Sequence, residues 1–154
     1  MSSTSSPALP TAVEPPEQIT RFLRYSRYFN LNTGRIKLEG LLPPPVDIAA
    51  RRTRLETSVY RADDVSSEDL WEICAKYVDK PDSTMKARAT VEAAAFLERQ
   101  LAFDADGNPH PRHANVIDWP EEKHLQKDLA REIADRMTLL KTLEGRPGVQ
   151  LAAV

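Results

Sequence analysis

Three stretches in the first 62 residues have the alternation of apolar and polar positions that is typical of β-strands. Residues 56–62 (ETSVYRA) are rich in β-branched and aromatic side chains and predict a strand. Residues 35–42 (RIKLEGLL) follow the turn signal Asn32-Thr33-Gly34 and predict another. Residues 18–29 fit either a strand or a helix, because arginines recur at every third position, and we favour the strand.

Two other stretches carry apolar residues at helical spacing. A helix is predicted over residues 67–78, with Ser66 or Ser67 as its N-cap and an apolar stripe of Leu70, Ile73, Cys74 and Tyr77. A long amphipathic helix is predicted near the C-terminus from the stripe Leu125, Leu129, Ile133, Met137 and Leu140. Its predicted start is the capping-box pair Asp118 and Glu121 with Pro120 in the first turn, and its predicted end is Gly145 and Pro147.

The remaining stretches complete the predicted fold. Residues 83–100 are rich in alanine and predict mainly a helix, although the alternation of Ala87, Ala89 and Val91 leaves a short strand open. Residues 101–107 and 113–119 predict two strands that are joined through a turn at DADGN (104–108). Together these elements predict an α+β fold, in which a small, mostly antiparallel sheet packs against two or three helices.

The length of 154 residues and the apolar content of 41% predict a single folded domain, over residues 18–144. Residues 1–17 are rich in proline and serine and predict a disordered arm, and residues 145–154 form a C-terminal tail. The single cysteine, Cys74, lies on a helical apolar stripe and predicts a core thiol. With no recognisable signal peptide and no apolar run near 20 residues, we expect a cytoplasmic protein that does not enter a membrane.

The charged residues are distributed unevenly along the chain. Residues 21–54 hold eight basic and two acidic residues, a net charge of +6, which leaves −8 for the rest because the whole chain carries −2. Such a split predicts either an acidic partner for the basic segment or neutralisation of one half of the protein by the other. A protein partner is expected on these grounds, and nucleic acid is an alternative.

All three histidines lie within residues 109–124 (PHPRHANVIDWPEEKH). His110 and His113 are separated by a proline turn and His124 lies one turn into the next element, so their spacing fits no established metal-binding motif. DADGN resembles the start of a calcium loop, but its glycine is at position 4 instead of 6. We therefore predict no metal site, and no motif in the chain indicates a cofactor.

Residues 21–29 interleave arginines with aromatic rings, a composition that can hold phosphates and stack on bases. Arg21, Arg24 and Arg27 are therefore candidate binding residues for nucleic acid, although no established nucleic-acid-binding motif accompanies them. The alternative is that the rings belong to the core and that the arginines face solvent or pair with acidic residues.

The sequence contains no GxSxG, P-loop or GxGxxG motif, so the usual signatures of acyl transfer, nucleotide hydrolysis and dinucleotide binding are missing. One enzymatic alternative remains. Arg61 ends one predicted strand and His113 begins another, and if they meet, the arginine can hold a phosphate while the histidine moves a proton. This arrangement predicts a phosphate-handling hydrolase or transferase.

Three short segments, SVYR (58–61), the pair Leu70-Trp71 and HANVIDWP (113–120), resemble an uncharacterised group of small bacterial proteins. The resemblance covers roughly residues 20–143. It implies a bacterial origin and a compact α+β domain, and it implies no activity or catalytic residue. It draws attention to Arg61, His113, Asn115 and Trp119, of which Asn115 and Trp119 are further candidate binding residues.

These observations lead to one expected function and two alternatives. We expect a non-catalytic adaptor or accessory subunit of a bacterial protein assembly, which contacts its partner through the N-terminal arm and the basic segment 21–54. The alternatives are the nucleic-acid-binding module that uses Arg21, Arg24 and Arg27, and the phosphate-handling enzyme that uses Arg61 and His113.

Overall fold

The structure of the chain is a computed structural model that describes residues 9–30 and 32–140. Its centre is a six-stranded sheet in the order β6-β7-β4-β1-β5-β8, and every pair of neighbouring strands is antiparallel. The six strands are β1 (Gln18–Leu23), β4 (Thr57–Arg61), β5 (Ala87–Glu92), β6 (Ala102–Asp104), β7 (His113–Ile117) and β8 (Thr138–Leu140). The predicted α+β fold with an antiparallel sheet is confirmed.

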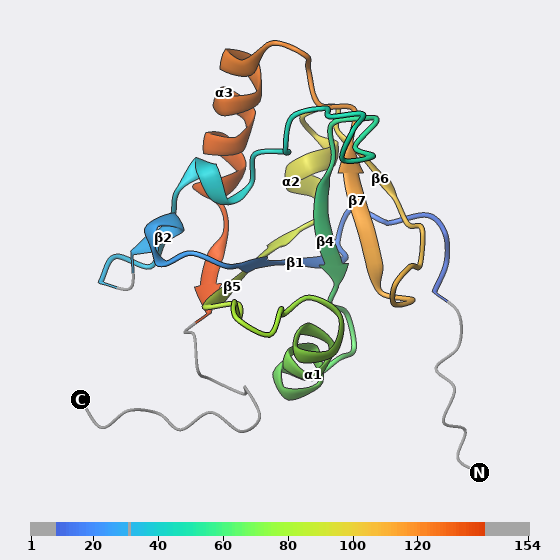
Figure 1. Cartoon of the computed structure of the whole chain (residues 1–154), viewed down its shortest axis with the longest axis vertical. Coiled ribbons are helices and arrows are strands. Elements are labelled where there is room, and N and C mark those ends of the chain that lie inside the picture. Colours follow the sequence, from blue (N-terminus) through green and yellow to red (C-terminus); the bar gives the residue numbers. More distant parts are fainter. Residues whose placement is uncertain (1–8, 31, 141–154) are drawn as a thin grey trace.

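The other elements surround this sheet. The helices are α1 (Ser67–Tyr77), α2 (Ala94–Leu97) and α3 (Lys123–Ala134), with two short 3₁₀ turns, η1 (Ser26–Tyr28) and η2 (Leu38–Gly40). A small hairpin of β2 (Phe29–Asn30) and β3 (Arg35–Ile36) forms a second sheet. Figure 1 shows α1 and α3 at opposite ends of the view, with the large sheet between them.

The two faces of the large sheet bury different cores. One face carries small and branched side chains, among them Ile19, Val59, Ala89 and Val116, which pack with residues of α2 and α3. The other face carries Phe22 and Tyr60, which pack against the buried side of α1. Because side chains alternate along a strand, neighbouring residues of one strand contribute to opposite cores.

The predicted helix 67–78 is confirmed as α1. The Ser66 hydroxyl accepts a hydrogen bond from the Asp69 amide at 3.0 Å, which satisfies one of the free N–H groups of the first turn. Leu70, Trp71 and Cys74 are buried against the sheet, and the buried position of Cys74 agrees with the prediction of a core thiol.

Over residues 83–100 the favoured helix is wrong for the first part, where the short strand that the sequence left open is confirmed. Residues 87–92 form strand β5, which lies between β1 and β8, and only residues 94–97 form a helix. Ala87, Ala89 and Val91 all face the core on the side of α2 and α3. The helix propensity of alanine is a few tenths of a kcal/mol per residue, and pairing on both edges outweighs it.

The predicted C-terminal helix is also corrected. Helix α3 begins at Lys123 and ends at Ala134, and its N-cap, Glu122, makes no side-chain capping bond, so the capping box of Asp118 and Glu121 is wrong. Residues 138–140 form strand β8 on the edge of the sheet beside β5. The spacing of Met137 and Leu140 therefore continues the helical stripe only by coincidence, and the predicted helix end at Gly145 and Pro147 lies outside the described residues.

The other predicted strands are confirmed in full or in part. The strands at 56–62, 101–107 and 113–119 are confirmed as β4, β6 and β7, and residues 18–29 begin with the favoured strand, β1. Residues 35–42 are a strand only at Arg35–Ile36 and then turn into η2. Residues 43–54 form a long connection to β4, which is closed on itself by a bridge between Asp47 and Arg52.

The described part of the N-terminal arm, residues 9–17, contacts the domain. Arg61 donates hydrogen bonds to the backbone carbonyls of Pro10 and Ala12, and Val13 packs against the core on the side of α2 and α3. Residues 1–8 and the C-terminal tail 145–154 lie outside the described residues. None of the helices within residues 9–30 and 32–140 has the length and apolar character needed to cross a membrane.

Candidate functional site

The pairing of β4 with β7 places four polar or aromatic side chains on one face of the sheet. Ser58 lies opposite Asn115 and Tyr60 lies opposite His113, and both pairs share the face that α1 covers in part. Directly opposite residues of an antiparallel pair lie close enough for their side chains to interact. The register alone therefore brings a hydroxyl, an imidazole and a carboxamide together.

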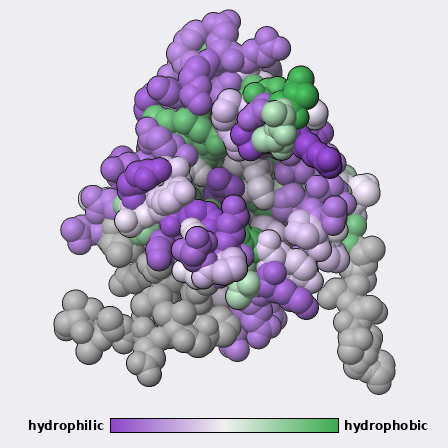
Figure 2. Space-filling model, viewed as in Figure 1, coloured by the Kyte–Doolittle hydropathy of each residue, from purple (hydrophilic) through white to green (hydrophobic). Residues whose placement is uncertain are grey.

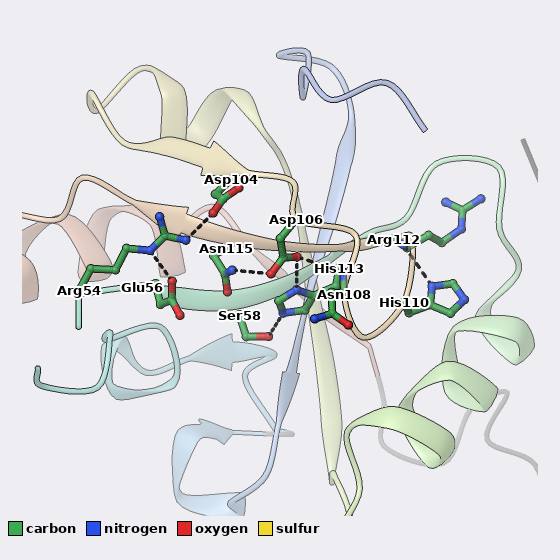
Figure 3. Close-up of polar contacts among 10 residues, drawn as sticks. All are labelled: Arg54, Glu56, Ser58, Asp104, Asp106, Asn108, His110, Arg112, His113 and Asn115. Carbon is green, nitrogen blue, oxygen red and sulfur yellow. Dashed lines mark hydrogen bonds and ion pairs between the residues drawn. The ribbon is translucent and has the colours of Figure 1, made fainter. Parts of the chain in front are cut away.

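His113 connects a hydroxyl to a carboxylate. Its Nε2 lies 2.7 Å from Oγ of Ser58, and its Nδ1 lies 2.8 Å from Oδ1 of Asp106. An ionised carboxylate only accepts hydrogen bonds, so Nδ1 carries the proton and Nε2 is left to accept the Ser58 hydroxyl proton. Figure 3 shows this chain of contacts running from Ser58 through His113 to Asp106.

Asp106 is held in place by the connection between β6 and β7. The second oxygen of its carboxylate accepts a hydrogen bond from the Asn115 amide at 3.1 Å, so both oxygens are fixed by β7. Gly107 follows with a φ of 65°, a left-handed conformation that side chains rarely adopt, and it directs the chain back toward β7. The DADGN segment leaves β6 as an irregular loop that supplies a carboxylate to the site. The turn predicted at residues 104–108 lies later, where the His113 amide donates to the carbonyl of His110.

The imidazole of His113 is packed as well as hydrogen-bonded. Its ring lies 5.2 Å from the ring of Tyr60 in a T-shaped arrangement, and Tyr60 in turn packs edge-on against Phe22. Burial, with smaller contributions from Cys74 and Asp106, raises the pKa of Tyr60 to about 12, so the phenol is neutral near pH 7. The side chain of His113 is only 10% exposed, which restricts the imidazole to one orientation.

A pocket of about 170 Å³ opens beside Ser58. It is lined by Arg21, Pro44, Arg52, Arg54, Glu56, Ser58 and Asn115. Ser58 itself is exposed, in contrast to the buried His113. We call the hydrogen-bonded series Ser58–His113–Asp106 the relay. Its Ser58 hydroxyl is therefore the end that a small molecule can approach.

Arg21 forms one wall of this pocket where β1 and β4 separate. The two strands pair only at Ile19–Arg61 and Thr20–Tyr60, and Arg21 then donates to the carbonyls of Gly40 and Ser58 at 2.9 and 2.8 Å. Burial lowers the pKa of Arg21 to about 10, a value at which it is still charged near pH 7. Among the described residues no carboxylate forms an ion pair with Arg21, so its charge is neutralised less than that of the other two arginines.

The other two arginines of the pocket come from the connection before β4. Arg54 contacts the carboxylates of Glu56 and Asp104, as Figure 3 shows, and these bonds raise its pKa. Arg52 lies 3.6 Å from Asp47 and donates through Nε to the carbonyl of Pro45. Each guanidinium has five N–H donors, so both retain donors for a ligand.

The predicted pair Arg61 and His113 does not share a site. Arg61 alternates with Tyr60 along β4, so its side chain lies on the opposite face of the sheet from His113. There its Nε and Nη2 donate to the carboxylate of Glu17, and the Arg61 side chain is only 3% exposed. Arg61 is occupied in holding the N-terminal arm.

The three arginines of the aromatic run also separate. Arg21 belongs to the pocket described above, whereas Arg24 donates to the carbonyls of Ser83 and Val78. Arg27 is exposed and lies over the ring of Tyr25, with 4.3 Å from the guanidinium carbon to the ring centroid. The run therefore offers one exposed guanidinium instead of three on a common surface.

The other sequence candidates have structural partners. The buried indole of Trp119 donates to the carbonyl of Val116 at 3.1 Å. The ring of His110 lies 5.4 Å from the ring of Tyr77 in a tilted arrangement, and burial together with the charges of Arg112 and Lys76 lowers the pKa of His110. His124 is exposed next to Glu122. Within the described residues, no group of three or more histidine, cysteine, aspartate or glutamate side chains is arranged to hold a metal ion.

Sequence reasoning found His113 and Asn115 but missed Ser58 and Asp106. Ser58 was considered only as part of the SVYR strand, and Asp106 only as part of the DADGN turn and of the rejected calcium loop. The available signal was the alternation within both strands, which places Ser58 with Tyr60 and His113 with Asn115. The register between β4 and β7 was needed to join these pairs, and it depends on long-range packing.

Comparison of the chain with models of protein families, with curated proteins and with solved structures gives no match.

Proposed function

We propose that this chain hydrolyses small esters, with Ser58 as the nucleophile, His113 as the general base and Asp106 as the residue that orients His113. The observation that carries the proposal is the pair of short contacts on the two nitrogens of His113, 2.7 Å to Ser58 and 2.8 Å to Asp106. The proposal keeps the hydrolase class and the histidine of the sequence alternative. It replaces Arg61 with Ser58 and Asp106.

The arrangement has the roles that a Ser–His–Asp triad requires. The base lies within hydrogen-bond reach of the nucleophile and a third group orients the base. The carboxylate favours the tautomer in which Nε2 is free to take a proton, and it stabilises the imidazolium that forms. Asn115 adds a fourth member, because its amide fixes the second oxygen of Asp106.

The proposed reaction has two halves. As the Ser58 oxygen attacks the ester carbon, His113 takes the hydroxyl proton of Ser58. His113 then gives this proton to the alcohol oxygen as the ester C–O bond breaks, and the acyl group remains on Ser58. Water then attacks the acyl group while His113 takes a proton from it, and this proton returns to the Ser58 oxygen. The products are one acid and one alcohol.

The side chains around the pocket supply groups that can stabilise the oxyanion of each tetrahedral intermediate. Arg52, Arg54 and Asn115 line the space beside Ser58 and carry N–H donors. Removal of a single oxyanion donor typically costs about 100- to 1,000-fold in rate, so these residues are expected to contribute measurably.

Covalent labelling tests the proposal directly. Incubation of the full chain with a fluorophosphonate, followed by peptide mass spectrometry, is expected to place the label on Ser58. The rate of 4-nitrophenyl acetate hydrolysis is expected to fall about 1,000-fold or more in Ser58→Ala, because the nucleophile is lost. Ser26→Ala, at another exposed serine, serves as the matched control and keeps both label and rate.

Two results contradict the proposal. One is a label on any other residue with Ser58 unmodified, and the other is a Ser58→Ala chain that hydrolyses the ester as fast as the unchanged chain. In either case the contacts of His113 serve only to stabilise the loop between β6 and β7.

A second candidate function is the adaptor expected from the sequence, and one observation favours it. Ile48 and Val46 are 78% and 50% exposed, in the connection that also carries the exposed Arg51 and Arg52. Figure 2 shows an apolar patch, in green, over the segment between η2 and β4. Exposed apolar residues beside charged ones are typical of protein contacts.

Photo-crosslinking distinguishes this candidate. A photoreactive residue at position 48 in a chain expressed in bacterial cells is expected to yield one defined crosslinked protein, and a photoreactive residue at position 127 on α3 is expected to yield none. Equal crosslinking from both positions contradicts a specific contact.

A cytoplasmic setting remains part of either proposal, because the only cysteine, Cys74, is a buried thiol.

A further inference from the structure

We propose that the ester carries an anionic group, a carboxylate or a phosphate, and that the arginines of the pocket beside Ser58 bind it. This inference rests on the proposed function for its reaction, but the binding it describes is measurable without any reaction. Its carrying observation is that three guanidinium groups, and only one carboxylate, line a small pocket next to the hydroxyl.

The three arginines of the pocket are matched in number by three carboxylates, Asp47, Glu56 and Asp104, but these are shared unevenly. Arg54 has two carboxylate partners and Arg52 has one at 3.6 Å, whereas Arg21 donates only to the carbonyls of Gly40 and Ser58 among its described contacts. A cation without a carboxylate partner in a partly enclosed space attracts an anion more strongly than one in open water. Guanidinium groups also match the planar, two-oxygen geometry of carboxylates and phosphates.

Arg52 is the residue best placed to contact the anion. Arg21 is tied to the backbone of β4, and Arg54 bridges Glu56 and Asp104, so both are already fixed by structural contacts. The side chain of Arg52 is 43% exposed and its contact with Asp47 is long. Its Nε donates to the carbonyl of Pro45, and its remaining N–H groups are available to a ligand.

The size of the pocket limits the ligand. A volume of about 170 Å³ is smaller than the several hundred Å³ of sites that enclose drug-sized molecules. The site therefore takes a short-chain compound, in which the anionic group and the ester lie only a few bonds apart.

Binding to the Ser58→Ala chain tests this inference separately from catalysis. Calorimetric titration with glutarate and, in a second arm, with inorganic phosphate is expected to show binding, whereas the neutral analogue glutaramide is not expected to bind. The two arms decide between carboxylate and phosphate as the preferred group. In Arg52→Gln, also in the Ser58→Ala background, the affinity for the bound anion is expected to fall about 10-fold, because one charged hydrogen-bonding partner is lost.

Arg35→Gln is the control, because Arg35 is an exposed arginine with one long carboxylate contact, 3.9 Å to Asp135, and it is not among the residues that line the pocket. It is expected to leave the affinity unchanged. Equal binding of glutarate and glutaramide, absence of binding by both anions, or equal losses in the Arg52 and Arg35 variants overturns the inference. If label and activity still depend on Ser58, the proposed hydrolase stands and only its selectivity for anions fails.

Discussion

The two faces of the sheet at β4 and β7 use the same strands for different purposes. On the face toward α2 and α3, Val59, Ala114 and Val116 are fully buried and Arg61 is neutralised by Glu17. On the face toward α1, the intervening residues form the relay of Ser58 and His113 with Asn115 beside it. One face loses all contact with water, and the other keeps an exposed hydroxyl.

This difference teaches that burial of a polar group is not by itself a sign of function. Arg61 is the most deeply buried of the candidate residues, yet its contacts are complete and hold the arm. Ser58 is exposed, yet it ends a chain of oriented hydrogen bonds beside a pocket. Substitutions on the face toward α2 and α3 are therefore expected to change stability, and those on the face toward α1 to change activity.

The largest expected effect is on activity. Asp106→Asn is expected to lower kcat for 4-nitrophenyl acetate about 1,000-fold, because the amide favours the wrong tautomer of His113. The free energy of unfolding, measured by thermal denaturation, is expected to change by less than about 1 kcal/mol, since the exposed loop residue Asp106 buries little surface. A variant that keeps its rate removes Asp106 from the proposed mechanism.

The second largest effect is a loss of stability, and it is expected at Arg61 on the face toward α2 and α3. Arg61→Met is expected to cost about 3 kcal/mol in urea unfolding, because it leaves the carboxylate of Glu17 without its partner in a mostly buried site. Addition of Glu17→Gln is expected to recover part of this loss. At temperatures where the variant is folded, the rate of ester hydrolysis is expected to be unchanged, and a loss of rate would place Arg61 in the reaction.

A smaller effect is expected at the residue next to Ser58. Val59→Ala removes two buried methyl groups and is expected to cost about 2 kcal/mol of unfolding free energy, with kcat unchanged. Ser58→Ala is expected to show the reverse pattern, a lost rate with a stability change below about 1 kcal/mol. If both variants lose stability equally, the two faces do not differ as described.

The smallest effect concerns pH. The pKa of His110 is lowered in the folded chain, so the unfolded chain takes up this proton first as the pH falls. The free energy of unfolding is therefore expected to decrease as the pH drops through the ordinary histidine value near about 6.5 and below it. In His110→Gln this decrease is expected to be smaller, which chemical unfolding at pH 8 and pH 5 measures.

The sequence predicted the fold class well because local patterns decided most elements. The serine cap and apolar stripe located α1, and β-branched residues located β4 and β7. At residues 87–92 the sequence left both a helix and a short strand open, and at residues 138–140 a continued helical stripe predicted a helix where the structure has a strand. In both segments the decision was made by pairing with strands distant in the chain, which a local window does not contain.

The candidate site was predicted only in part for the same reason. His113 and Asn115 were selected from a short motif, but their partners are Ser58 on β4 and Asp106 in the loop before β7. Arg61 was selected as the partner of His113 although alternation places it on the other face. A shift of the pairing register by one residue moves each side chain of a strand to the other face of the sheet. The register is fixed by the packing of the whole sheet, so a single strand does not show which face a residue occupies.

The separation of β1 from β4 has a consequence for engineering. Where the strands separate, the carbonyl of Ser58 has no strand partner on that side, and Arg21 supplies the missing donor while it also contributes the least compensated charge of the pocket. Arg21 therefore has a role in holding the backbone that Arg52 does not share. The lining of this pocket can be redesigned at Arg52, but not at Arg21 without loosening the strand that carries Ser58.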